Sequence, residues 1–239
     1  MKDFLLSSLR QYLKNPLIII FFVFILVTQY LLEIISFKVN SEIVLSSYLV
    51  HSIWLAAGFA ISVLLFSFFI SLAISFSFRS MDRKASMSHL FSGVRHTHKV
   101  FVLMLVNILV FSLAFGVSYL FQIFAENIKI TPLIFQVTVF VVYMADILGI
   151  LIFLSFSFFA CISEDISIMQ SMKRSWYFVK KNYLTVLMLF VSLFIISQLV
   201  NLASGIIFFE LISLTEIINF FIVYPLMAIF FSRFYNSYR

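Results

Sequence analysis

The residues of this chain that could do chemistry are few, and the most unusual of them stands inside a long apolar run. Asp146 is the one charged side chain deep in such a run, and insertion of a central charge costs about 2.5 to 3.5 kcal/mol. Counted along helices from their basic ends, four polar residues reach a similar depth: Gln29, Asp146, Gln198 and Asn219. This polar belt could bind a small solute, an ion or a lipid headgroup. The alternative is that a protonated Asp146 and the amides only hold helices together.

A second candidate group is basic and precedes the fifth apolar run. The apolar residues between 168 and 179 recur at helical spacing, with Lys and Arg on the other faces, which predicts an amphipathic helix at the membrane surface. Basic side chains there can contact anionic lipid phosphates at about 1 kcal/mol per charge. We expect headgroup contacts from Lys173, Arg174, Trp176, Lys180 and Lys181, and from Arg95 and Lys99 in an earlier basic segment. The alternative is that these residues only fix the orientation of the chain.

Enzymatic and metal chemistry are not expected. The segment Ala203-Ser204-Gly205 is similar to the serine motif of rhomboid proteases, but no deep histidine is available as its base. An intramembrane aspartyl protease needs two acids, whereas Asp146 stands alone. His96 and His98 lie in a basic segment that repels cations, so we expect no metal site. With no nucleotide-binding glycine loop, the sequence predicts neither an enzyme nor a cofactor.

The elements that must position these residues are membrane helices. Of the 239 residues, 63% are hydrophobic and 11% are charged, more apolar surface than a soluble domain of this length can bury. About 20 apolar residues cross the hydrocarbon core, so runs without charged residues mark the spans. The sequence predicts an all-α, polytopic membrane protein with a single domain, 1–239, that forms a six-helix transmembrane bundle. The spans are expected at about 16–37, 52–78, 99–125, 131–160, 182–209 and 213–234.

The distribution of basic residues predicts the orientation. The segments 1–14, 79–99, 164–181 and 233–239 carry 14 Lys and Arg, whereas the alternate loops carry only Lys38 and Lys129. Because Lys and Arg are retained on the cytoplasmic side, we expect a cell-membrane protein with both termini in the cytoplasm and an even number of spans. Topology thus accounts for the pI of about 9.5, and we expect no nucleic-acid partner.

Short similarities at an offset of about 80 residues indicate an internal repeat. Ser75-Phe76-Ser77-Phe78 matches Ser155-Phe156-Ser157-Phe158, and Ser92-Gly93-Val94-Arg95 matches Ser171-Met172-Lys173-Arg174. With the N-terminal Ser8-Leu9-Arg10, these matches predict three units, each a basic interfacial helix followed by a helical hairpin. Coincidence among segments rich in Ser, Phe and Lys is the alternative.

The third unit carries a family likeness in Glu164-Asp165-Ile166-Ser167, Ser171-Met172-Lys173-Arg174-Ser175-Trp176 and Val179-Lys180-Lys181-Asn182. This stretch of about 20 residues resembles the six-span membrane domain associated with glycerophosphodiester phosphodiesterases and related uncharacterised bacterial and archaeal membrane proteins. In those fusions the phosphodiesterase activity belongs to a separate soluble barrel, for which this chain has no room. The resemblance therefore implies a stand-alone membrane module without that activity.

Two functions follow as hypotheses. The first is a non-enzymatic membrane module that engages anionic lipids or a protein partner through its basic cytoplasmic face. The second is a transporter or channel for a small solute, an ion or a lipid, which would use the polar belt around Asp146. A water-accessible path to Asp146 would favour transport, and a sealed core with an occupied basic face would favour the first hypothesis.

Overall fold

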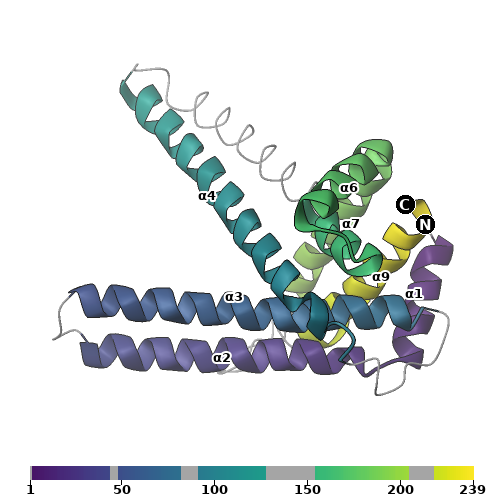
Figure 1. Cartoon of the computed structure of the whole chain (residues 1–239), viewed down its shortest axis with the longest axis horizontal. Coiled ribbons are helices and arrows are strands. Elements are labelled where there is room, and N and C mark those ends of the chain that lie inside the picture. Colours follow the sequence, from purple (N-terminus) through teal and green to yellow (C-terminus); the bar gives the residue numbers. More distant parts are fainter. Residues whose placement is uncertain (1, 44–47, 82–90, 128–153, 205–217) are drawn as a thin grey trace.

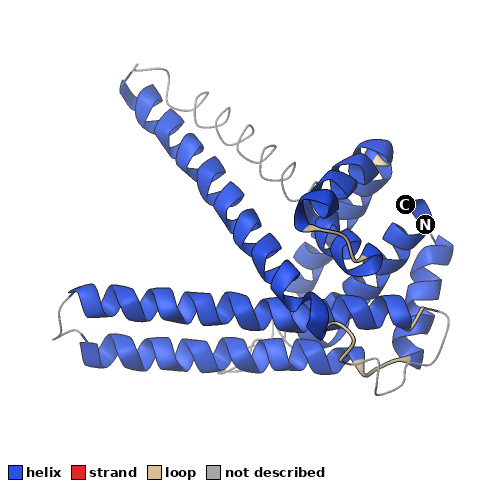
Figure 2. Cartoon of the chain, in the orientation of Figure 1, coloured by secondary structure: helices blue, strands red, loops and turns tan. Residues whose placement is uncertain are grey.

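The structure is a computed structural model, and it describes residues 2–43, 48–81, 91–127, 154–204 and 218–239. These residues form helices joined by turns, and no strand occurs among them, which confirms the all-α class (Figure 2). In chain order the elements are α1 (Lys2–Lys14), α2 (Ile18–Ile43), α3 (Tyr48–Arg79), the short 3-10 helix η2 (Val94–His96), α4 (Thr97–Asn127), the helical segment Leu154–Glu164, α6 (Ile168–Lys181), α7 (Tyr183–Ser204), the π-helical turn η3 (Asn219–Val223) and α9 (Tyr224–Tyr238).

One or two helices of the described residues could span a membrane. Among the residues whose side chains are described, Ala56–Arg79 is long and apolar enough to cross a membrane. A second candidate is the pair Leu6–Lys14 and Ile18–Leu31, if the two helices are counted as one bent span. The described helices overlap the predicted spans in position, although most of 131–160 and parts of the last two lie outside the described residues. The number of spans is taken up below as a proposal.

The bend between α1 and α2 follows from a single proline. The two helices meet at 82°, and Pro16 disfavours helical geometry at the residue before it. At that position the Asn15 side-chain nitrogen donates to the Gln11 carbonyl oxygen over 3.2 Å, closing the end of α1. The result is a short first helix set nearly perpendicular to the long second one, as Figure 1 shows.

The helices are gathered at one end of the molecule. Helices α2 and α3 lie side by side as an antiparallel hairpin, while α4 leaves α3 at an angle, so that its far end stands apart (Figure 1). Helix α1 packs against α9, so both terminal helices lie at the same end. The prediction that this end faces the cytoplasm remains a prediction.

Two aromatic cores hold that end together. In the first, the fully buried Phe156 ring lies 4.7 Å from Phe178 and 5.6 Å from Phe231, measured between ring centroids. The second joins α2 to α3 and α9, and the Phe21 and Phe76 rings meet in it at 5.8 Å. Phenylalanines from segments far apart in the sequence thus fix the place where the basic segments converge.

Candidate functional site

The first basic segment, α1, buries polar side chains and exposes apolar ones, the reverse of the usual pattern for a helix on the surface of a soluble protein. Its Ser8 and Gln11 side chains are buried against the rest of the protein, whereas Leu6, Leu9 and Leu13 are exposed along the opposite face. Gln11 is held firmly: its side-chain nitrogen donates to the Ser77 carbonyl oxygen at 2.8 Å, and its side-chain oxygen accepts from Arg233. The helix therefore turns polar groups inward and a leucine stripe outward.

Helix α6 repeats this pattern. Ser167 caps it, and the capping box is completed by Gln170. The side chains of Ser171, Ser175, Phe178 and Val179 are buried, whereas Met169, Trp176 and Tyr177 are exposed. The apolar residues that the helical spacing assigned to one face thus divide between a protein-facing and an outward-facing side. Lys173, Lys180 and Lys181 are exposed beside the outward group.

Between these two helices in the sequence lies the segment Phe91–His96, and it sits directly on α3. A Cβ atom added to Gly93 would stand 2.3 Å from the carbonyl oxygen of Ser71, so the approach requires a glycine. The hydroxyls of Ser75 and Ser92 meet at 2.8 Å, and those of Ser71 and Thr97 at 3.1 Å. This contact fixes Arg95 and His96 beside the end of α3.

Asp165, in the turn before α6, connects that turn to Arg95 and His96. It has a positive φ of 51°, and its carboxylate receives the Lys99 ammonium at 2.8 Å. Arg95 and His96 nitrogens lie 3.9 and 3.5 Å from its two carboxylate oxygens. The hydrogen bond from Lys99 is the main cause that lowers the pKa of Asp165. Four residues from two segments therefore form one ionic cluster at the basic end.

His96 is buried within this cluster and is neutral at neutral pH. Burial, and then the adjacent Arg95 guanidinium, lower the pKa of His96, against an opposing effect of Asp165. The Arg95 Nε donates to His96 Nε2 at 2.9 Å. Since Nε2 accepts, the neutral ring carries its proton on Nδ1, the atom that faces Asp165.

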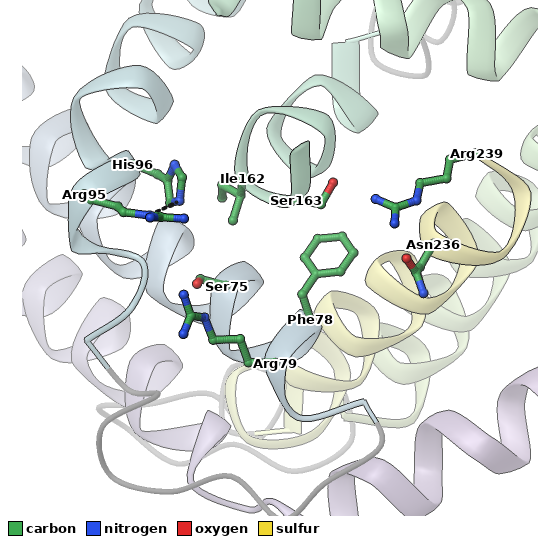
Figure 3. A pocket seen from close by; sticks show the side chains of 9 residues that line it. All are labelled: Ser75, Phe78, Arg79, Arg95, His96, Ile162, Ser163, Asn236 and Arg239. Carbon is green, nitrogen blue, oxygen red and sulfur yellow. Dashed lines mark hydrogen bonds between the residues drawn. The ribbon is translucent and has the colours of Figure 1, made fainter. Parts of the chain in front are cut away.

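A polar pocket of about 280 Å³ opens beside the cluster (Figure 3). Its lining comes from the end of α3, from η2, from the Leu154–Glu164 helix and from the end of α9. The polar lining residues are Ser75, Arg79, Arg95, His96, Ser163, Asn236 and Arg239, and Phe78 and Ile162 complete the wall. The Ser163 hydroxyl is buried and has no hydrogen-bond partner among the described residues. Figure 3 shows Ser163 and Arg239 facing one another across the pocket.

An apolar cavity of about 520 Å³ lies deeper in the bundle. Its lining is mostly apolar, with phenylalanines from α2, α3, the Leu154–Glu164 helix, α7, η3 and α9, and Gln29 is among the few polar residues there. The η3 turn, which carries Asn219, packs against α2, so two elements of the predicted polar belt are brought together. The side chain of Gln198 and all of Asp146 lie outside the described residues. The belt as a whole therefore stays a prediction.

The predicted headgroup residues have different surroundings in the structure. Lys99 and Arg95 lie at Asp165, and the Arg174 Nε lies 3.4 Å from a Glu164 carboxylate oxygen. In the described part of the chain, no carboxylate pairs with Lys173, Lys180 or Lys181. Arg79, Arg239 and Ser163 were not among the predicted site residues. Arg79 and Arg239 end or follow the second and sixth apolar runs, which is the one signal that could have pointed to them.

Across the described residues, no three His, Cys, Asp or Glu side chains are grouped so that they could hold a metal ion. A scan against protein-family models, a search of curated proteins and a search of solved structures return no match. The resemblance to the membrane domain of glycerophosphodiester phosphodiesterases therefore remains a prediction that rests on the residues 164–182.

Proposed function

We propose that the chain is a multi-pass membrane protein with six spans and cytoplasmic termini, and that its basic end binds anionic lipids. The observation that carries this proposal is the inverted burial of α1 and α6. Each buries serines against the protein and exposes large apolar side chains beside Lys or Arg. Such a face is unfavourable in water, whereas at a membrane interface the apolar groups enter the acyl boundary and the cations reach the phosphates.

Helix length supports the spans. Helices α2, α4 and α7 have 26, 31 and 22 residues. At about 1.5 Å of rise per residue, each is at least as long as the ~30 Å hydrocarbon core. Most of the exposed side chains described along α4 are large and apolar, including Leu105, Leu109 and Leu113. Lipid is the solvent that such a surface requires.

Orientation can be tested with compartment reporters. Fusions after residue 90, in a basic segment, and after residue 128, in a segment with few cations, should report opposite sides of the membrane, because Lys and Arg are retained in the cytoplasm. The fusion after residue 90 should report the cytoplasm. If both fusions report the same compartment, the six-span arrangement is wrong.

Lipid engagement can be tested by mass spectrometry of lipids retained by the purified protein. The triple variant Lys173→Gln, Lys180→Gln, Lys181→Gln should retain less phosphatidylglycerol relative to phosphatidylcholine than the parent, by about fivefold per lysine at ~1 kcal/mol each. The control is Lys38→Gln with Lys129→Gln, which removes cations from the predicted outer side. Equal retention by the parent and the triple variant would overturn the lipid proposal.

A second candidate, transport of a small solute, an ion or a lipid, is favoured by one observation, the cavity that Gln29 lines near η3. Asp146→Asn should then abolish uptake or release while the protein is still made at normal levels. If Asp146→Asn leaves every transport phenotype intact and Asp146→Leu only lowers expression, the acid has a packing role and the transport hypothesis fails.

A further inference from the structure

We propose that the pocket between Arg79, Arg95 and Arg239 is a binding site for a phosphate group. The three guanidiniums come from three separate segments, the end of α3, the η2 turn and the end of α9, and all of them line one pocket. No Asp or Glu side chain is among the described residues of that lining. Convergence of cations from distant parts of the chain on one space creates a region where an anion is strongly favoured.

The positive charge of the pocket is only partly offset by its neighbours, since Glu164, beside the lining residue Ser163, is paired with Arg174. Asp165 lies 3.9 Å from Arg95, but the same carboxylate is held by Lys99 at 2.8 Å. Within the described residues, no carboxylate pairs with Arg79 or Arg239. The C-terminal ends of α3 and α9 contribute only about half a negative charge each. Three full positive charges therefore outweigh the partial and shared negative ones.

Buried polar atoms add specific hydrogen-bonding capacity. The Ser163 hydroxyl is buried without a partner and lines the pocket, so it can donate to an anion oxygen. A buried polar group without a partner is destabilising, and a bound ligand would remove that cost. The exposed Asn236 adds an amide to the lining. Figure 3 shows these groups and the guanidiniums around a common space.

The number of donors favours phosphate over a carboxylate. A carboxylate has two oxygens in one plane, which a single arginine can satisfy. Three guanidiniums and a hydroxyl on different walls instead match a tetrahedral anion with three or more free oxygens. The volume of about 280 Å³ corresponds to roughly nine water molecules at ~30 Å³ each, enough for a phosphate with a small substituent.

The phosphate could belong to a lipid headgroup or to a soluble phosphate compound. The apolar cavity begins close below the pocket on the same two helices, since Ile74 precedes Ser75 and Phe159 lies one turn before Ser163. That continuity is the reason to test a lipid. Only the lipid form of the inference rests on the proposed function, because a soluble phosphate needs no membrane to bind.

The first arm of the test uses the full chain in neutral detergent with inorganic phosphate and with glycerol 3-phosphate, at constant ionic strength set with chloride. Binding is read by calorimetry and by the shift in thermal unfolding. Arg79→Gln and Arg239→Gln should each weaken phosphate binding about tenfold or more, because each removes a charged hydrogen bond. Arg10→Gln is the matched control: an exposed arginine on α1, outside the pocket lining.

The second arm places the same variants in nanodiscs with phosphatidic acid, and lipid retention is compared with phosphatidylcholine. Arg10 lies on the α1 face that the proposed function places against lipid, so the control in this arm is the outer-side pair Lys38→Gln with Lys129→Gln. Loss in both pocket variants but not in this control identifies a lipid phosphate; loss in the soluble arm alone identifies a soluble one. Ser163→Ala should lower affinity a fewfold without altering the fold. If neither arm shows binding, or if Arg10→Gln reduces binding in the soluble arm as much as the pocket variants, the proposal is overturned. If the reporter fusions showed the opposite orientation, the proposed function would be wrong, whereas phosphate binding in the first arm would still support the pocket.

Discussion

Two regions of the molecule are held together in different ways. The basic end is the region where α1, η2, α6 and the end of α9 lie, and the shafts are the parts of α2, α3 and α4 that extend away from it. At the basic end, side chains bond across elements: Gln11 to Ser77 and Arg233, Lys99 to Asp165, and the Tyr235 hydroxyl to Glu164 at 2.7 Å. Farther along the shafts, polar groups such as Ser62 bond within their own helix. Large apolar side chains cover the shaft surface, including Phe24, Phe59 and Leu109.

This difference shows which part of the chain defines the structure. On the proposed membrane location, apolar surface gains little from contact with more apolar surface, so the long helices have weak preferences for one mutual arrangement. Hydrogen bonds and tightly packed aromatic rings are directional, and among the described residues they are concentrated at the basic end. We expect changes there to destabilise the fold far more than equivalent changes on the shafts.

The largest expected effect is on the aromatic core. Phe156→Ala removes a fully buried ring that contacts Phe159, Phe178 and Phe231 among others, and should lower the free energy of unfolding by about 3–5 kcal/mol. Phe59→Ala, at an exposed ring on the α3 shaft, should change it by less than about 0.5 kcal/mol. Thermal unfolding in detergent checks both; similar losses would remove the distinction between the two regions.

A smaller effect is expected from a matched pair of glycines. Gly93→Ala places a Cβ atom against the Ser71 backbone and should cost about 1–3 kcal/mol. Gly116→Ala, on the α4 shaft, meets nothing within 4 Å and should be neutral or slightly stabilising, since alanine favours a helix. Equal unfolding midpoints for the two variants would show that η2 does not dock on α3 as described.

Loss of the hydrogen bonds that join α1 to α9 should lower the free energy of unfolding somewhat less. Arg233→Met leaves the Gln11 side-chain oxygen and the Met81 carbonyl oxygen without their donor, which costs about 1–2 kcal/mol. Arg10→Met alters an exposed arginine on α1 and serves as control. Protease sensitivity of the two termini should rise in the first variant only; a rise in both would point to loss of charge as the cause.

The smallest effect is a pH dependence confined to the basic end. The pKa of His96 is lowered in the folded state from its ordinary value of 6.5. Below about pH 6.5 the unfolded chain therefore takes up a proton that the folded chain resists, and stability falls as the pH drops toward the folded pKa. Asp165, whose pKa is lowered from 3.8, adds its own loss only at more acidic pH. In the His96→Gln variant the unfolding midpoint should vary less with pH between 6.5 and 5 than in the parent. An unchanged dependence on pH would contradict this.

Sequence reasoning succeeded where a pattern is local. Low charge and long apolar runs predicted helices, and Ser167 with its following amphipathic segment corresponds to a capped α6. It was less successful on α6 itself, because both the buried and the outward face carry large apolar side chains, so periodicity assigned Val179 and Trp176 to one side. The pocket lining could not be predicted, since Arg79, Arg95 and Arg239 meet only once α3, η2 and α9 are packed.

The serines of α3 bear on the order in which the protein assembles. Ser67 and Ser77 donate to carbonyl oxygens four residues earlier in the same helix, and Ser71 to one three residues earlier. Hydroxyls that bond within their own helix carry little polar penalty into a bilayer. Ser71 and Ser75 also meet Thr97 and Ser92 of the next segment. On the proposed membrane location, α3 would therefore insert with most of its hydroxyls satisfied, and the contacts with Thr97 and Ser92 would form as the next segment docks.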